Sequence, residues 1–75
     1  MIIVTTPTIP GRVILKTLGL VEGSGLASAD ARSELLKQAE ELGASGIVGY
    51  NATAGGGNDG NTVFIQFGTA VVLKQ

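Results

Sequence analysis

The sequence of 75 residues contains neither cysteine nor histidine, and aromatic residues make up only 4% of it. Without cysteine the chain forms no disulfide and offers no thiolate to a metal ion. Without histidine it lacks the commonest general base and the commonest ligand of transition metals. These absences exclude the usual zinc and copper sites and any catalysis that depends on a cysteine or histidine side chain.

The chain also has no large excess of charge of either sign, because five basic and six acidic residues give a net charge of −1. A nucleic-acid-binding protein needs a basic stripe that displaces counterions, and a protein held on a membrane by charge needs a basic cluster. The apolar run at the start of MIIVTTPTIPGR is too short for a signal peptide, and no segment approaches the length of a membrane span. We therefore expect a cytoplasmic protein with neither nucleic acid nor membrane as partner.

Apolar residues, in contrast, are abundant for so short a chain: they make up 44% of it, with a mean hydropathy of +0.38. The length indicates one small domain covering residues 1–75, and such a domain buries only a modest share of its surface. The excess of apolar side chains predicts that part of the surface is buried between subunits.

The residue pattern of the first third of the chain predicts extended structure. The β-branched segment 1–8 forms a short strand-like piece, and Pro7 and Pro10 prevent it from continuing as a central strand. Residues 12–23 form the first full strand, with apolar side chains on both faces and a bend or bulge expected at Gly19.

A single helix follows and is expected from Ala29 to Leu42, because apolar residues recur there at helical spacing. Ser28 is the predicted N-cap, and Gly43 stands where a glycine commonly ends a helix. The apolar stripe comprises Ala31, Leu35, Ala39 and Leu42, with Leu36 at its edge.

Two further strands, at 45–53 and 62–75, are joined by a glycine-rich hairpin, for which Asp59-Gly60 is a strong turn signal. The fold class is therefore α+β, a β-α-β-β domain. Its three-stranded, mainly antiparallel sheet has the last strand in the centre and the helix on one face. The helix covers only one face, so we expect the other, carrying Phe64, Val72 and Leu18 or Leu20, to be covered by a partner chain.

Several segments together resemble the YbjQ-like family, a group of small bacterial proteins often labelled as heavy-metal-binding. They are TTPTIPGR with GLVEG, the helix end AEELGASGIVGYN, and the terminal FGTAVVLK. The resemblance covers most of the chain and implies a dodecin-like subunit assembled into a closed ring, a pentamer. Family members typically carry an additional stretch between the first long strand and the helix, so this chain resembles a shortened version.

The sequence offers few residues that are suited to binding a metal ion or to catalysis. The oxygen donors Glu40 and Glu41 are typical of a solvated helix surface, and the segment around Asp59 lacks the spacing of a calcium loop. A symmetric ring of Asp59 or Glu22 side chains could hold a hard cation weakly. We expect no enzyme activity, no cofactor and no specific metal site.

Ligand binding is the remaining class. Thr5, Thr6 and Thr8 beside Arg12 offer hydroxyls and a guanidinium suited to a phosphate or carboxylate; alternatively, the threonines only satisfy turn backbone around the prolines. The glycine-rich loop is either a flap that closes over a ligand or a plain hairpin connection. The candidate ligand-binding residues are Thr5, Thr6, Thr8, Arg12, Tyr50, Asn51, Asn58 and Phe64.

The sequence thus supports a non-catalytic ring that binds or sequesters a small anionic, nucleotide-like signalling molecule between its subunits. The alternatives are a structural or protein-interaction module, and a weak metal-binding protein as the family label suggests.

Overall fold

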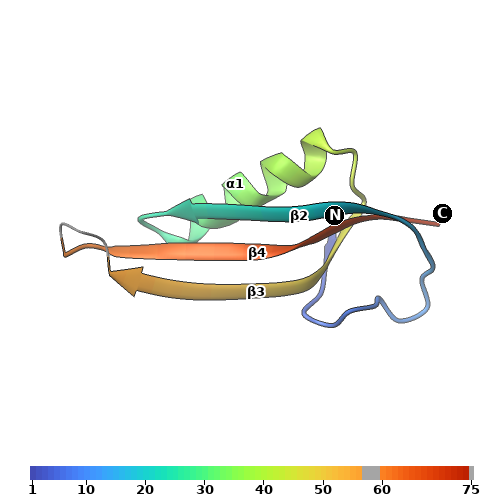
Figure 1. Ribbon diagram of the computed structural model, residues 1–75, viewed down its shortest axis with the longest axis horizontal. Helices are drawn as coiled ribbons and strands as arrows, with labels where there is room; N and C mark the ends of the chain where they lie inside the picture. The colour runs from blue at the N-terminus through green and yellow to red at the C-terminus, as the bar shows by residue number, and fades with distance from the viewer. Residues whose placement is uncertain (57–59, 75) are drawn as a thin grey trace.

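The computed structural model describes residues 1–56 and 60–74. Four strands form one sheet in the order β1-β3-β4-β2, and a single helix lies along one of its faces (Figure 1). In chain order the elements are β1 (Ile2–Ile3), β2 (Ile14–Gly25), α1 (Ser28–Glu41), β3 (Gly46–Gly56) and β4 (Thr62–Leu73). The predicted α+β class and the central place of the last strand are confirmed.

The strand count was one too low, because the N-terminal segment joins the sheet. β1 pairs with the start of β3 in parallel, with Ile2 opposite Gly46. β4 runs antiparallel to both β3 and β2, so β2 and β3 point in the same direction. The pairing of β2 with β4 shifts register next to Gly19, whose φ is 135°, as the sequence predicted.

The helix buries the stripe that its periodicity predicted, since Ala31, Leu35 and Ala39 are fully buried. It ends at Glu41, so Leu42 follows it and stays 48% exposed. Gly43 adopts a φ of 83° just after the end, as expected of a terminating glycine. Within the described residues, no helix is both long and apolar enough to cross a membrane.

The predicted N-cap at Ser28 was wrong. The capping residue is Ala27, with extended backbone and no side-chain cap bond. The Ser28 hydroxyl instead accepts a hydrogen bond from Nε2 of the buried Gln66, at 3.2 Å, and its carbonyl accepts a second from the same atom, at 3.1 Å. This buried side chain therefore ties the start of α1 to β4 and takes the hydroxyl that would otherwise cap the helix.

The face that α1 covers was also assigned wrongly, since we expected Phe64 and its neighbours to lie on the helix-free face. Gln66 and Ala70, which alternate with Phe64 along β4, are buried, and Ala70 packs in the same cluster as Leu35 of α1. Glycine allows this close approach: a Cβ at Gly23 would lie 2.1 Å from the Ala31 carbonyl oxygen. The helix thus lies over the face with the smaller side chains.

The opposite face is covered at one end by the N-terminal arm, residues 4–13. Ile9 of this arm is buried against Val48, Val71 and Leu73 in a second cluster. The arm leaves the sheet at the end where both termini lie (Figure 1). Farther along this face Leu20, paired with Thr69, is 72% exposed. Of the two leucines expected on the helix-free face, Leu20 lies there, whereas Leu18 packs against the helix-side cluster.

Candidate functional site

The threonines of the N-terminal arm lie along the outer side of β3. The amide of Gly49 donates to the Thr6 carbonyl and that of Tyr50 to the Val4 carbonyl, both at 2.9 Å. The Thr6 hydroxyl donates to the Thr8 carbonyl at 2.6 Å, which is the turn-satisfying role that the sequence left open. Within the described residues the hydroxyl of Thr5 has no hydrogen-bond partner, and its side chain is exposed.

Arg12 lies on the other side of β4. Its Nη2 donates to the Lys74 carbonyl at 3.4 Å, a long bond that leaves most of the guanidinium donors available. The backbone fixes its position, because the Lys74 amide donates to the Val13 carbonyl at 2.8 Å and the Arg12 amide donates to the Ile9 carbonyl at 3.1 Å. The arm therefore holds its threonines beside β3 and its arginine beside the start of β2.

The other candidate residues are dispersed along the sheet. Tyr50 is half-buried against the helix-side cluster, and Asn51 next to it is exposed, with its Oδ1 accepting from the Ala52 amide at 2.8 Å. Phe64 lies toward the hairpin end, opposite Ala54. Asn58 and Asp59 lie outside the described residues. Backbone pairing with Gly49 and Tyr50 thus places the segment of Thr5 and Thr6 beside β3 near Asn51, whereas Arg12 and Phe64 lie elsewhere on the sheet.

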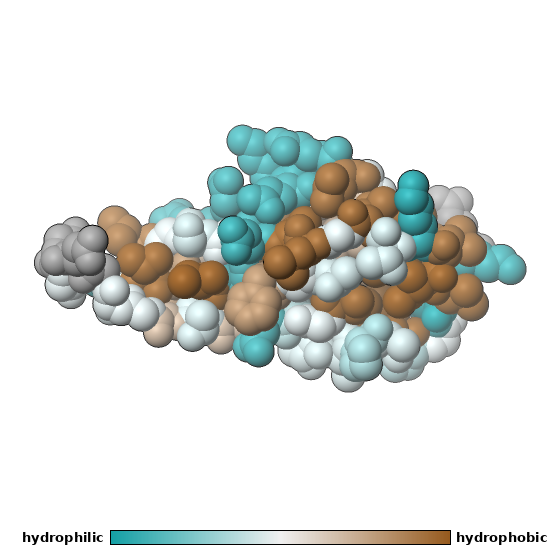
Figure 2. Space-filling model, in the orientation of Figure 1, coloured by the Kyte–Doolittle hydropathy of each residue, from teal (hydrophilic) through white to brown (hydrophobic). Residues whose placement is uncertain are grey.

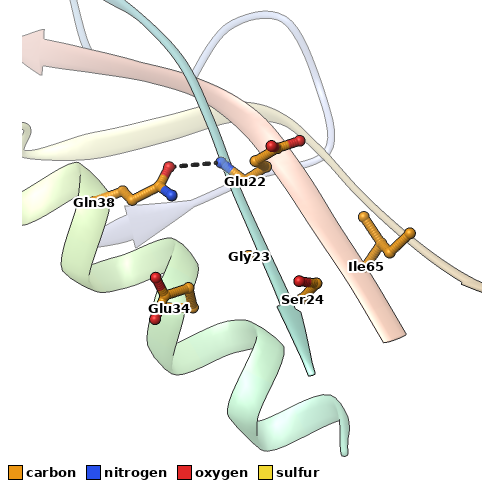
Figure 3. A pocket seen from close by; sticks show the side chains of 6 residues that line it. All are labelled: Glu22, Gly23, Ser24, Glu34, Gln38 and Ile65. Atoms are coloured by element: carbon orange, nitrogen blue, oxygen red, sulfur yellow. Dashed lines mark hydrogen bonds between the residues drawn. The ribbon is translucent and has the colours of Figure 1, made fainter. Parts of the chain in front are cut away.

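A separate hollow of about 280 Å³ lies between α1 and the outer edge of β2 (Figure 3). The backbone amide of Glu22 donates to Gln38 Oε1 across it, at 3.1 Å. The carboxylates of Glu22 and Glu34 make this hollow unfavourable for an anion. Its lining residues are Glu22, Gly23, Ser24, Glu34, Gln38 and Ile65.

None of the candidate ligand residues lines this hollow, and sequence reasoning did not find it. The available signal was the small pair Gly23-Ser24 on a strand that passes beneath a helix. Within residues 1–56 and 60–74, no three or more acidic side chains lie close enough together to hold a metal ion.

No known protein-family profile matches the sequence. The chain is 35% identical to a UPF0145 protein of Francisella tularensis over 83 aligned positions, covering 97% of this chain and 78% of the relative. It is 34% identical to a UPF0145 protein of Shewanella frigidimarina over 103 positions, covering 97% and 96%. Since this chain has 75 residues, the Shewanella relative carries additional residues within the aligned region.

The fold is also similar to a crystal structure from Pediococcus pentosaceus, described as a protein of unknown function of the DUF74 family. The TM-score is 0.69 at 24% identity, covering 99% of this chain and 98% of the other. The structural similarity supports the fold, and the sequence identity to the two UPF0145 proteins supports the family assignment. The chain belongs to the UPF0145 family, to which the YbjQ-like resemblance also pointed.

Proposed function

We propose that this protein assembles into a closed homo-oligomeric ring, a pentamer as the YbjQ-like resemblance implies. The ring binds a small anionic, nucleotide-like molecule between neighbouring subunits and holds it without chemical change. The observation that carries the proposal is the separation of the candidate ligand residues onto two sides of one sheet.

Thr5 and Asn51 lie on the β3 side, whereas Arg12 lies at the start of β2, across β4. A ring in which the β2 side of one subunit faces the β3 side of the next brings these groups together at every interface. Their hydroxyl, amide and guanidinium groups donate hydrogen bonds to a phosphate or carboxylate. None of them is a general base at neutral pH, which is consistent with binding and not catalysis.

Exposed apolar side chains support assembly. Leu15 is 62% exposed and Leu20 is 72% exposed, both on β2. Figure 2 shows hydrophobic surface along the strands, whereas hydrophilic surface gathers over the outer side of α1. Soluble monomers rarely expose extended apolar patches, so this surface is explained most simply by contact with another subunit.

A second candidate is a ring that presents apolar loops to a protein partner. Leu26, which is 68% exposed, favours it, because this residue lies between β2 and α1 and beyond the end of the strand. Binding of a small molecule and presentation of this leucine are compatible functions of one assembly.

The ligand proposal is tested by calorimetric titration of the purified protein with a panel of cyclic and linear nucleotides. We expect Arg12→Ala to weaken binding by about 10- to 100-fold, because a charge-assisted hydrogen bond contributes about 1.5–3 kcal/mol. Lys37→Ala is the matched control, since it removes the same charge from the exposed surface of α1. A nucleotide that binds equally well to wild type and Arg12→Ala would contradict the proposed site.

A further inference from the structure

We infer that the anion-binding group of the protein is larger than Arg12 and that its ligand carries at least two phosphate groups. Arg12, Lys16 and Lys74 form one cationic patch, the basic end, at the end of the sheet where both termini lie (Figure 1). The inference rests on the proposed function in taking Arg12 as an anion contact. It adds the two lysines as contacts and names the class of ligand, a small polyphosphate such as a nucleoside diphosphate or triphosphate.

Charge is divided unevenly along the chain. Residues 1–21 and 60–75 contain three basic residues and no acidic one, whereas residues 22–59 contain two basic and six acidic residues. The net charge of −1 is thus the difference between +3 in the first part and −4 in the second. All three basic residues of the first part belong to the basic end. A local excess of positive charge attracts an anion even where the protein as a whole is slightly acidic.

Backbone pairing brings the two lysines together from opposite ends of the sequence. Lys16 of β2 lies opposite Val72 of β4. Lys74 follows Val72 by two residues, and its amide donates to the Val13 carbonyl at 2.8 Å, so the extended pairing continues as far as Lys74. Lys16 and Lys74 are therefore diagonal neighbours on one face of the sheet, at a separation of about 7–8 Å that long side chains can span.

Arg12 completes the basic end from the N-terminal arm. Its Nη2 donates to the Lys74 carbonyl at 3.4 Å, which places the guanidinium beside Lys74 and leaves most of its N–H donors for a ligand. All three basic side chains are exposed, and within residues 1–56 and 60–74 none of them has an ion-pair partner. Like charges held this close repel one another, so a multiply charged anion that binds among them relieves the repulsion.

Three neighbouring cations fit a short polyphosphate better than a single phosphate or a nucleic acid. The guanidinium of Arg12 can bind two oxygens of one phosphate, and the ammonium groups of Lys16 and Lys74 then need the oxygens of a second. A diphosphate or triphosphate supplies these oxygens within the basic end. A longer polyanion would extend beyond it, over a surface where acidic residues predominate.

Calorimetric titration with orthophosphate, pyrophosphate and tripolyphosphate tests the inference without a nucleobase. The titrations are done at low ionic strength, where exposed charges are least screened. We expect the two polyphosphates to bind about 4- to 25-fold more tightly than orthophosphate, since two further exposed ion pairs contribute about 2- to 5-fold each. The double variant Lys16→Gln/Lys74→Gln should lose this preference. Arg32→Gln/Lys37→Gln, which removes the same charge from the exposed surface of α1, should keep it.

A wild-type protein without the preference, or a preference that survives in Lys16→Gln/Lys74→Gln, would overturn the inference. If Arg12→Ala still weakened orthophosphate binding in that case, the proposed anion contact would stand. A monomer that shows the lysine-dependent preference would refute the intersubunit site and support the basic end, because one chain supplies all three basic residues. A short single-stranded oligonucleotide that binds more tightly than tripolyphosphate, and loses this binding in the same double variant, would assign the basic end to nucleic acid and overturn the inference.

Discussion

Replacing Gly23 by alanine tests the closest contact between the helix and the sheet. The added Cβ would lie 2.1 Å from the Ala31 carbonyl oxygen and 2.6 Å from the Leu35 amide nitrogen. Both are backbone atoms of α1, so no side-chain rotation relieves the clash. The helix or β2 must shift, and the packing of Leu35 and Ala39 against the sheet must loosen.

Such overpacking typically destabilises a protein by about 1–3 kcal/mol. Urea unfolding followed by circular dichroism measures the change, at one fixed protein concentration because the stability of an assembly depends on it. Gly55→Ala is the control, since its Cβ would have no other atom within 4 Å. If the Gly23→Ala midpoint matches that of Gly55→Ala, the helix does not lie on this glycine as described.

Two further substitutions test the buried polar contact and the arm. Gln66→Glu should destabilise the fold by about 2–4 kcal/mol at pH 7, because it replaces the donor to Ser28 with a buried carboxylate. Burial raises the pKa of that introduced carboxyl, so the deficit in urea midpoint should shrink as the pH falls from 7 to 4.5, and a pH-independent deficit would contradict this. Ile9→Ala should cost about 2–4 kcal/mol and speed amide exchange in the arm, since Ile9 fills the cluster with Val71 and Leu73. Val13→Ala, at a side chain 58% exposed, should change the midpoint by less than about 0.5 kcal/mol, and equal effects of the two would refute the arm's anchoring role.

The sequence predicted the elements well because their signals are local. The spacing of Ala31, Leu35 and Ala39 identifies the buried side of the helix, and the turn-rich connections order the strands. Alternation along β4 separates its two faces but does not say which of them the helix covers. That choice depends on the close approach of backbones at Gly23, which is a property of the packed structure.

The candidate site was predicted less completely, because its residues depend on topology. The arm pairs with β3 and then crosses to β2, which separates Thr5 from Arg12. β1 has only two residues, which are too few for a pattern of apolar and polar residues to predict that the arm pairs with β3. The hollow beside Glu34 arises where β2 passes under the helix. In the sequence, each acidic residue that lines the hollow is typical of an ordinary solvent-exposed surface.

Sedimentation velocity of the wild-type protein at micromolar concentration tests the central claim most directly. The subunit mass is 7.6 kDa. We expect a single species at a small whole-number multiple of this mass, with the value for a pentamer as the specific prediction. A single species with the mass of one subunit would contradict both the ring and the intersubunit ligand site.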